Sequence, residues 1–577
     1  MSLHALLMMF CLMSANADTG HFSLMLDGDW KFRRDPQNVG LKENWQRADL
    51  DDSSWDIMKV PGDWGKDADG VGWYRKRITI PERARKAANV ALLFGSADDR
   101  AELFLNGRLA RRSRSWSTPF LVDPRPFMGA DGSLLIAVRV EDIGGPGGIV
   151  ESVSLRSADS MEDLYKTPLY DQKIPHTLDD TGGIVLYSVY IRNFSQEGTF
   201  NALRARLPEL KALGVNTLWL LPIHEIGMEK RKGPDGSPYA IKDYYSISHD
   251  LGTKEDFKAL VKATHDQGMK ILIDSVMNHT SPDSTWATEH PEWFSRDENG
   301  KPKPDVADWS DVVDLDWNNK VVWEEATKVM EYWVREFDID GYRCDVADMM
   351  PAAFWLQARA RLDAIKPGIV MLAESGNPSH FFNGFDIIYS DGVRDVMHEI
   401  VNGDATADDM RQEIYNQLYS QPRRSTRMLF VENHDKPRVM NFLKSRAQVE
   451  ALAVLTATLP GVPLVYTGTE VGANADRDAT FFVKSPVDWS DPQQMRPFWG
   501  DLLARRAKHR ALQTGEFRFV EAEPADRVLV YERFIGDDVV TISVNLSNEP
   551  ATLKLKTPNP EVPNTMLPWE WKINASH

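Results

Sequence analysis

Strand-like apolar runs alternate with amphipathic helical segments from Gly182 onward, and this alternation is the strongest constraint on the fold. The run Ile184–Ile191 precedes a helical segment around Thr199–Leu213, which Gly214 ends, and the run Val215–Leu221 follows. Six further runs bring the total to eight: Lys270–Val276, Gly341–Asp345, Ile369–Ala373, Asp386–Tyr389, Met428–Val431 and Val462–Tyr466. Eight parallel strands, each followed by a helix, close into a (β/α)8 TIM barrel. The alternative is an open doubly wound sheet. It is less favoured, because no Gly-rich phosphate-binding fingerprint follows the first apolar run of this sequence.

The helix predicted before Lys270 carries its own start and stop signals. Thr253 and Asp256 have the spacing of a capping box, in which each side chain bonds the backbone N–H of the other. Gly268 stands where the helix is expected to end.

Sequence on either side of this pattern predicts two β domains. Residues 18–157 carry short alternating runs, such as Tyr74–Ile80, Val90–Phe94 and Ser133–Val140, and form an N-terminal β-sandwich in this interpretation. A polar linker is expected over 158–181, the catalytic barrel over 182–514 and a small C-terminal β domain over 515–577. The segment of about 281–318 is too long for an ordinary strand-to-helix loop, so it is predicted to be an inserted subdomain.

The first residues predict export. Leu3–Met13 is a short apolar run, and Ala15-Asn16-Ala17 has the spacing of a signal-peptidase site, although Lys and Arg are missing before the run. We therefore expect residues 1–17 to be a signal peptide and the protein to be secreted or periplasmic. Removal of this segment leaves Cys344 as the single cysteine, so no intrachain disulfide is expected.

Charge and hydropathy exclude two classes of partner. The chain has 67 basic and 85 acidic residues, a net charge of −18, and no long Lys/Arg run, so it should repel nucleic acid. No run after the predicted signal approaches the ~20 apolar residues of a membrane span. Uncharged ligands such as sugars remain compatible with this surface.

Polar side chains stand where four of the predicted barrel strands end. They are Asp274, Asn278 and His279 at the third strand, Arg343 and Asp345 in the fourth, Glu374 at the end of the fifth, and His434 and Asp435 after the seventh. The carboxyl ends of barrel strands converge on one mouth, where TIM-barrel active sites lie. The sequence therefore predicts a single polar pocket.

Spacing within this pocket favours a pair of carboxyl groups with different protonation. Arg343 and Asp345 are two residues apart and share a strand face, so the guanidinium should favour the ionised form of Asp345. Glu374 lies on the neighbouring strand, ~4.8 Å away, near the ~5–5.5 Å carboxyl separation of retaining glycosidases. Anionic neighbours should favour the protonated form of Glu374. A purely structural ion pair is the weaker interpretation, because one arginine cannot neutralise three convergent carboxylates.

Four segments resemble the signature regions of the α-amylase family, glycoside hydrolase family 13. ILIDSVMNHT resembles the first region, GYRCDVAD the second, MLAES the third and FVENHD the fourth, while VPLVYTGTEVG resembles the segment of strand eight. The resemblance implies that Asp345 is the nucleophile, that Glu374 is the acid/base and that Asp435 stabilises the distorted sugar of the transition state. It further implies that Arg343 holds the nucleophile and that the substrate is bound by Tyr239 (in GSPYAIKDYY), His279 and His434.

Departures from the family pattern concern calcium and specificity. The loop FSQEGTF lacks the Asp-rich calcium motif of some relatives, and Val-Ala-Asp follows Asp345 in place of a Lys-His pair. Asn278 matches a position that often binds calcium, so calcium stays an open alternative, while the chemistry itself implies no required cofactor. VVDLDWNN has Asp316 where Asn is common, which leaves the fine specificity open.

A second resemblance concerns the N-terminal domain. LDGDWKF, VPGDW and GWYRKRITIP resemble the jelly-roll sugar-binding domain of the β-galactosidase and β-glucuronidase family, where a packing role is favoured. Trp64 and Trp73 are the candidates if this domain binds glucan. Core packing is also favoured for the four tryptophans of the insert, which otherwise would line outer sugar subsites: Trp286, Trp293, Trp309 and Trp317.

These observations predict a retaining glycoside hydrolase that cleaves α-1,4-glucosidic bonds in starch-type α-glucans or malto-oligosaccharides. An α-glucosidase, a debranching enzyme or a glucanotransferase would use the same Asp345, Glu374 and Asp435. A non-catalytic carbohydrate-binding protein is disfavoured, because all three carboxylates remain. β-Glycoside hydrolysis rests on the N-terminal domain alone, and the barrel motifs argue against it.

Overall fold

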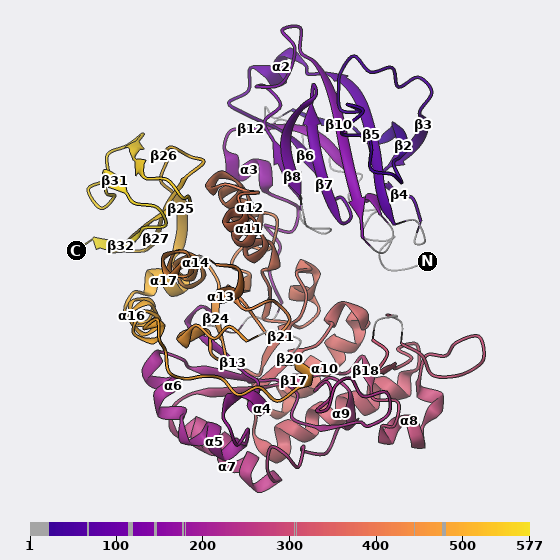
Figure 1. The fold of residues 1–577 in the computed structure, drawn as a ribbon, viewed down its shortest axis with the longest axis vertical. Helices are drawn as coiled ribbons and strands as arrows, with labels where there is room; N and C mark the ends of the chain where they lie inside the picture. The colour runs from indigo at the N-terminus through magenta and orange to yellow at the C-terminus, as the bar shows by residue number, and fades with distance from the viewer. Residues whose placement is uncertain are drawn as a thin grey trace. The chain divides into compact units, whose positions relative to one another are not determined.

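The computed structural model describes residues 22–65, 69–113, 119–143, 147–175, 178, 181–304, 306, 309–443, 445–475 and 481–576. The predicted signal peptide, residues 1–17, lies outside the described residues. The chain divides into two compact units (Figure 1): the first contains residues 1–170 and 415–421, and the second contains residues 171–414 and 422–577.

The first unit is a β-sandwich of two antiparallel sheets, as the alternating runs predict. One sheet has the order β1 (Ser23–Met25), β12 (Val153–Ala158), β6 (Asn89–Phe94) and β9 (Phe120–Val122). The other has the order β3 (Asp56–Val60), β2 (Gly28–Arg34), β5 (Gly70–Thr79), β10 (Ser133–Asp142), β7 (Arg100–Leu105) and β8 (Arg108–Ser113). A small pair, β4 (Gly62–Asp63) and β11 (Gly148–Ile149), and two short helices, α2 (Glu82–Arg85) and α3 (Met161–Tyr165), complete it. Alternate strand residues, among them Trp30, Phe94 and Leu103, form one apolar core.

Both tryptophans named as sugar-binding candidates in this unit are engaged by the protein. Trp73 is fully buried, and its indole nitrogen donates to Asp35 Oδ2 at 3.2 Å. The ring of Trp64 lies 4.6 Å from the guanidinium carbon of Arg34 and stacks at 6.1 Å on Tyr74. Trp73 is therefore a core residue that a sugar cannot reach from solvent.

The second unit contains a closed barrel of eight parallel strands, which confirms the predicted fold. In order, the strands are β13 (Leu186–Val189), β14 (Thr217–Leu220), β17 (Lys270–Ser275), β20 (Gly341–Cys344), β21 (Val370–Ala373), β22 (Ile387–Tyr389), β23 (Thr426–Leu429) and β24 (Val462–Tyr466). β13 pairs with β24 and closes the ring. Inward-facing residues such as Trp219, Leu272 and Leu464 fill the interior. β23 begins and ends two residues before the predicted run, because Phe430 and Val431 are also buried and burial alone does not mark where the ladder stops.

Helices and short 3-10 turns connect the strands. The helices are α4 (Ile191–Phe194), α5 (Phe200–Ala205), α6 (Leu207–Leu213), α7 (Lys254–Asp266), α9 (Lys320–Phe337), α10 (Ala352–Ile365), α11 (Asp391–Asn402), α12 (Ala407–Tyr419), α13 (Val439–Phe442), α14 (Arg446–Thr458), α16 (Met495–Lys508) and α17 (Arg510–Thr514). The 3-10 turns are η1 (Thr181–Gly183), η3 (Ala347–Met349), η4 (Pro378–Phe382) and η5 (Thr469–Val471).

Local sequence signals explain where some of these helices begin and end. The capping box of Thr253 and Asp256 is formed at the start of α7, and Gly214 ends α6 with a positive φ of 105°. The single helix predicted over Thr199–Leu213 is instead two helices, which meet at Arg206. Pro208 lies in the first turn of α6, where a residue without an N–H is tolerated, and it would interrupt a continuous helix.

The segment after β17 forms short elements that return to the barrel mouth. It contains α8 (Thr285–Glu289), the turn η2 (Pro291–Trp293) and β19 (Val313–Asp314), which pairs with β18 (His279–Thr280). The hairpin β15 (Glu225–Ile226) and β16 (Ile241–Asp243) lies after β14. Trp286, Trp293 and Trp317 are buried, as core packing requires, whereas Trp309 is half-buried.

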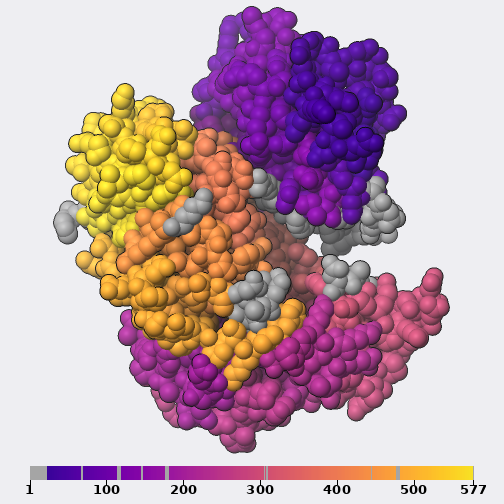
Figure 2. All heavy atoms as spheres, viewed as in Figure 1, coloured from indigo at the N-terminus to yellow at the C-terminus, as the bar shows by residue number. Residues whose placement is uncertain are grey.

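The C-terminal strands form a sheet in the order β25 (Glu516–Phe519), β27 (Val528–Ile535), β28 (Asp538–Asn545) and β32 (Trp571–Ser576). Two small pairs join β26 (Ala522–Glu523) to β30 (Lys554–Leu555) and β29 (Ala551–Thr552) to β31 (Thr565–Met566). The buried Leu553 lies between β29 and β30. In Figure 2 the yellow atoms of this domain adjoin the orange atoms of the last barrel helices, and Arg533 donates to the carbonyl of Thr458 at 2.7 Å. Within the described residues, none of the helices is long and apolar enough to span a bilayer.

Acid pH should weaken this barrel unit through His224. Burial lowers the pKa of His224 from the usual 6.5 to about 4, so the fold favours the neutral ring and the unfolded chain takes up the proton first. The stability from this group is complete above pH 6.5 and is lost as the pH falls toward 4. Between pH 7 and pH 5 the free energy of unfolding should fall by about 2 kcal/mol from His224. Urea unfolding at both values should show a smaller fall for His224→Gln. The side chain of His249 is 79% exposed, and His249→Gln should not flatten the dependence.

Candidate active site

Arg343 stands at the centre of the predicted pocket and binds three carboxyl groups. Its Nη1 atom lies 2.9 Å from Asp274 Oδ1 and 2.7 Å from Asp345 Oδ1, and its Nη2 atom lies 2.8 Å from Glu374 Oε1. Tyr389 accepts a hydrogen bond from Nε at 3.1 Å. Because two nitrogens of one guanidinium hold Asp345 and Glu374, the structure brings these two carboxyls together.

Strand register explains this meeting. Asp274 on β17 pairs with Arg343 on β20, and the amide of Asp345 continues the ladder by bonding the carbonyl of Ser275 at 3.0 Å. The amide of Glu374 continues the next ladder by bonding the carbonyl of Cys344 at 3.0 Å. Both carboxyls therefore leave the barrel at neighbouring strand ends.

Val346, directly after Asp345, is a feature that sequence reasoning missed. Its φ of 38° and ψ of 50° are left-handed, a conformation that is strained for a β-branched residue. This backbone turn lets the Val346 N–H donate to Glu374 Oε2 at 2.7 Å. Strain of this kind gathers at functional sites, and here it helps to orient the second carboxyl.

Electrostatics at Asp345 differ from the sequence prediction. Arg343 lowers the pKa of Asp345 as expected, but burial and then the charge of Glu374 raise it more, so the net pKa lies well above the usual range. The physical reason is that one guanidinium serves three carboxyls in a dry site, and interacting groups of this kind titrate as a set. The cluster favours one retained proton among its carboxyls.

Exposure separates the roles available to the carboxyls. The side chain of Asp345 is 8% exposed, whereas those of Glu374 and Asp435 are 25% and 33% exposed. Asp274 is buried and receives hydrogen bonds from Arg343, from Tyr239 Oη at 3.0 Å and from Trp219 Nε1 at 3.2 Å. Asp274 is therefore saturated by protein donors, in agreement with a scaffold role.

Tyr239 and His434 link this cluster to Asp435. The hydroxyl of Tyr239 lies 2.6 Å from His434 Nε2, which in turn lies 3.0 Å from Asp435 Oδ2. The rings of Tyr239 and His434 are nearly parallel, at 10° and 5.7 Å. Phe481 lies parallel to Tyr239 at 5.8 Å and 5°. Sequence reasoning missed Phe481, for which the only signal was the Phe-Phe pair after strand eight.

His279 reaches the same carboxyl cluster from β18, which pairs with β19. Its Nε2 atom lies 4.0 Å from Asp345 Oδ2, and its ring contacts the half-buried Trp309 at 5.2 Å. Burial lowers the pKa of His279 to about 4, so the ring is neutral near pH 7. A neutral imidazole both donates and accepts a hydrogen bond, as recognition of a sugar hydroxyl needs.

Asn278, the predicted calcium position, is buried. Its side-chain nitrogen has no hydrogen-bond partner within the part of the chain that the structure describes. The same part contains no group of three or more His, Cys, Asp or Glu side chains that could hold a metal ion. Calcium takes six to eight oxygen ligands, which include carbonyls and waters as well as carboxylates. Calcium binding at Asn278 therefore stays a prediction, and no step below uses a metal.

Two further buried acids, Glu432 and Glu470, lie at the barrel mouth, and the sequence analysis assigned no role to them. Glu432 lies 2.9 Å from Arg438 Nη1 and accepts a hydrogen bond from Thr469. Glu470 accepts a hydrogen bond from Tyr187 Oη at 2.7 Å, and burial raises the pKa of Glu470. Both acids bond residues at the ends of β13, β23 and β24, so we interpret them as structural.

Sequence comparison agrees with this geometry. The model of the alpha-amylase catalytic domain matches residues 157–311, 305–398 and 385–511. The chain belongs to the alpha-amylase family of glycoside hydrolases. The family resemblance predicted from the four motifs is confirmed for the barrel. The match begins at residue 157, so the resemblance of the preceding residues to the β-galactosidase jelly roll stays a prediction.

Two relatives show how much of the chain the similarity covers. The alpha-amylase MalA of Haloarcula japonica is 29% identical over 396 residues, covering 64% of this chain and 56% of MalA. A cyclomaltodextrinase of Geobacillus thermopakistaniensis is 27% identical over 383 residues, covering 62% of this chain and 64% of that enzyme. The matches thus span less than two thirds of both relatives.

Solved structures show the same fold. The noncanonic maltogenic alpha-amylase AmyB from Thermotoga neapolitana is 36% identical with a TM-score of 0.61, covering 65% of this chain and 88% of AmyB. An alpha-amylase from Lactobacillus plantarum is 33% identical with a TM-score of 0.59, covering 66% of this chain and 92% of that enzyme.

Proposed function

We propose that this protein is a retaining glycoside hydrolase that cleaves α-1,4-glucosidic bonds in malto-oligosaccharides or starch-type glucans. The observation that carries the proposal is the pair of carboxyls, Asp345 and Glu374, held on one guanidinium at 2.7 and 2.8 Å. Retaining glycosidases need two carboxyls about 5–5.5 Å apart, one as nucleophile and one as acid/base. The names of the relatives, an alpha-amylase and a cyclomaltodextrinase, support an α-glucan substrate.

In the first step Asp345 would attack the anomeric carbon while Glu374 gives its proton to the leaving oxygen. The bond from the sugar to that oxygen breaks, and an ester forms between the sugar and Asp345. Arg343 fits the ionised nucleophile, because Nη1 bonds the oxygen Oδ1 and leaves Oδ2 on the side of His279. The greater exposure of Glu374 suits a group that must meet the leaving oxygen.

In the second step Glu374 would take a proton from water, and the resulting hydroxide would attack the same carbon from the opposite face to Asp345. The ester bond breaks, and Asp345 returns as a carboxylate. Asp435, His279 and His434 would bind sugar hydroxyls around the reacting carbon, where bonds that strengthen in the transition state lower the barrier. Two inversions give net retention.

Product analysis tests the proposal directly. We expect maltotriose and soluble starch to be hydrolysed and the first reducing sugar released to be the α-anomer, observed by proton NMR before mutarotation. Release of the β-anomer would contradict the covalent intermediate. Hydrolysis confined to isomaltose or to the α-1,6 bonds of pullulan would contradict α-1,4 cleavage and favour a debranching enzyme. The end products seen by chromatography separate hydrolysis from glucan transfer.

A further inference from the structure

Asp348 has no role in the mechanism above. It ends the Val-Ala-Asp run that follows Asp345, and it lies in η3, three residues after the proposed nucleophile. Its side chain does not cap the next helix, α10, whose N-cap residue is Pro351. The role of Asp348 must therefore come from its other contacts.

Both carboxyl oxygens of Asp348 accept hydrogen bonds from the segment that follows β21. Ser375 Oγ donates to Oδ2 at 2.6 Å, and His380 Nε2 donates to Oδ1 at 2.8 Å. Asn377 Nδ2 makes a longer contact with Oδ1 at 3.5 Å. Because this segment begins directly after Glu374, Asp348 connects the chain after the nucleophile to the chain after the acid/base.

The two main donors are themselves fixed in place. The carbonyl of Ser375 accepts a hydrogen bond from the Tyr389 amide at 2.8 Å. The ring of His380 is buried and lies edge-on to Phe385 at 5.1 Å. Within the described residues Nδ1 of His380 has no partner, so its imidazole is oriented by the bond from Nε2 to Asp348. The contact thus joins rigid groups rather than two loose loops.

Asp348 makes these bonds as an anion. Burial raises the pKa of Asp348, but the hydrogen bonds from His380 and Ser375 together lower it more, so its net pKa lies below the usual range. A carboxylate can only accept hydrogen bonds, so both partners must direct their protons toward it. Bonds to an ionised acceptor are shorter and about twice as strong as neutral ones.

The same short stretch of chain therefore reaches the acid/base in two ways. The N–H of Val346 donates directly to Glu374 Oε2 at 2.7 Å, and Asp348 holds Ser375, the residue after Glu374. A general acid must lie within about 2.6–3.2 Å of the oxygen that it protonates, and a misplacement of about 1 Å can lower a rate by about 10²-fold.

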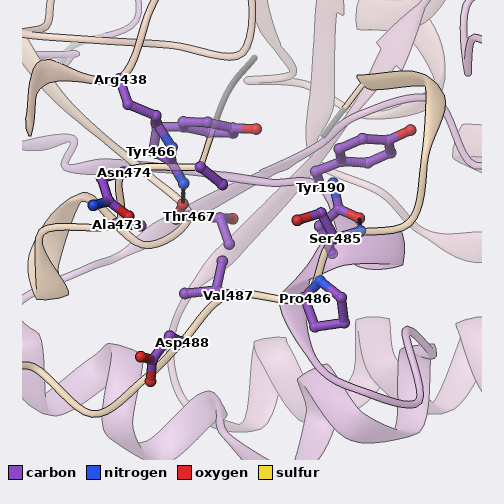
Figure 3. Close-up of a pocket in the computed structure, with 12 residues that line it drawn as sticks. Tyr190, Arg438, Tyr466, Thr467, Ala473, Asn474, Ser485, Pro486, Val487 and Asp488 are labelled. Atoms are coloured by element: carbon purple, nitrogen blue, oxygen red, sulfur yellow. Dashed lines mark hydrogen bonds between the residues drawn. The ribbon is translucent and has the colours of Figure 1, made fainter. Parts of the chain in front are cut away.

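The opposite wall of the mouth offers a carboxylate for comparison. Figure 3 shows a cavity of about 120 Å³ there, whose lining includes Tyr190 after β13, Tyr466 at the end of β24, and Asp488. In the closed ring of eight, β24 lies four strands from β20, and β13 lies four strands from β21. Asp488 is exposed and accepts a hydrogen bond from the Ser490 amide at 2.9 Å. It therefore lies across the mouth from Asp348.

We propose that Asp348 is a positioning residue, which holds Ser375 and thereby keeps the carboxyl of Glu374 in reach of the leaving oxygen. The inference rests on the proposed hydrolase function and deepens it. Asp348 acts through Ser375 rather than on the substrate. Its loss should therefore slow those reactions in which the leaving group needs a proton.

Two aryl maltosides isolate this effect. Phenyl α-maltoside and dinitrophenyl α-maltoside carry the same sugar, but phenol needs a proton to leave and dinitrophenol does not. Asp348→Ala should lower kcat/KM by about 10–10²-fold on the phenyl substrate and by less than about threefold on the dinitrophenyl substrate. The Asp348 side chain is 43% exposed, so its removal should spare the fold. Asp488→Ala makes the same change across the mouth and should leave the ratio of the two kcat/KM values unchanged.

Ser375→Ala tests the connection itself. It removes the donor to Asp348 Oδ2, so it should lower the phenyl-to-dinitrophenyl ratio as Asp348→Ala does. The double variant should be little worse than either single variant, because both break the same bond. Asp348→Asn keeps an oxygen for His380 and gains an N–H that can donate to Ser375 Oγ, so its ratio should stay within about threefold of wild type.

Three results would overturn the inference and leave the hydrolase function intact. One is an unchanged ratio in both alanine variants. Another is an equal loss on the two aryl maltosides, which would make Asp348 a general structural residue. The third is a loss confined to maltotriose, which would make it a sugar-binding residue. If the wild-type protein hydrolyses neither aryl maltoside, nor malto-oligosaccharides, the proposed function itself fails.

Discussion

Asp345→Asn should lower kcat on malto-oligosaccharides by about 10⁴-fold or more, because loss of a nucleophile removes the covalent step itself. The amide keeps the shape of the side chain, and its oxygen can still accept the bond that Arg343 Nη1 makes to Oδ1. Substrate binding should therefore persist, and isothermal titration with maltotriose should give a Kd near the wild-type KM. Steady-state assays at high enzyme concentration measure the residual rate.

A matched variant separates this effect from general disturbance of the barrel. Asp363→Asn makes the same chemical change on α10, where Asp363 pairs with Arg359 at 2.8 Å and has a side chain that is 32% exposed. It should keep near-wild-type kcat. The melting temperature of Asp345→Asn should not fall, because one carboxylate fewer then competes for Arg343. Turnover of Asp345→Asn above about a hundredth of the wild-type value would remove Asp345 as the nucleophile.

The barrel was predictable because its strands are buried on both faces. A parallel strand of this kind reads as a short apolar run, and each of the eight runs corresponds to an observed strand. Strand ends were less predictable where burial outlasts pairing, as at Phe430 and Val431. The break at Arg206 was missed, because the apolar spacing continues across it while Pro208 interrupts the backbone hydrogen bonds.

The sequence predicted which residues meet in the candidate site, but it predicted their pKa shifts only in part. The two-residue spacing of Arg343 and Asp345 correctly gives a shared face, and the ion pair at 2.7 Å follows from it. The net shift at Asp345 depends on burial and on Glu374 and Asp274, which come from other strands. A local sequence pattern cannot predict a pKa that depends on contributions from several distant residues. The turn at Val346 is equally invisible, because valine gives no signal for a left-handed backbone.

Three carboxyls around one buried guanidinium imply a division of labour. Asp274 is saturated by Arg343, Tyr239 and Trp219, so it holds the arginine in place rather than reacting. Asp345 and Glu374 then share the remaining positive charge, and Glu374 is the more exposed of the two. The buried carboxyl suits the proposed nucleophile, and the more exposed one suits the proposed acid/base, which has to meet the leaving oxygen and then water.

Glu374→Ala should lower kcat/KM on malto-oligosaccharides by about 10²–10⁴-fold, the range for loss of general acid–base catalysis. The loss should be far smaller with dinitrophenyl α-maltoside, because this leaving group departs without a proton. Hydrolysis of the resulting ester at Asp345 then lacks its base and becomes rate-limiting, so a burst of dinitrophenol should precede a slow steady state. Azide, which needs no base, should restore turnover and yield the α-glycosyl azide.

The conservative variant Glu374→Gln tests whether the proton or the structure is lost. Its amide oxygen can still accept the hydrogen bond from the Val346 N–H, which Glu374 Oε2 accepts at 2.7 Å, so the left-handed turn should persist while the acid is gone. After burial, the charge of Glu374 is the next largest factor that raises the pKa of Asp345. A neutral side chain removes that repulsion, Asp345 then ionises at lower pH, and the acid limb of kcat/KM for dinitrophenyl α-maltoside should move to lower pH. Azide that yields the β-glycosyl product with Glu374→Ala would instead assign Glu374 as the nucleophile, because attack on the intact substrate inverts only once.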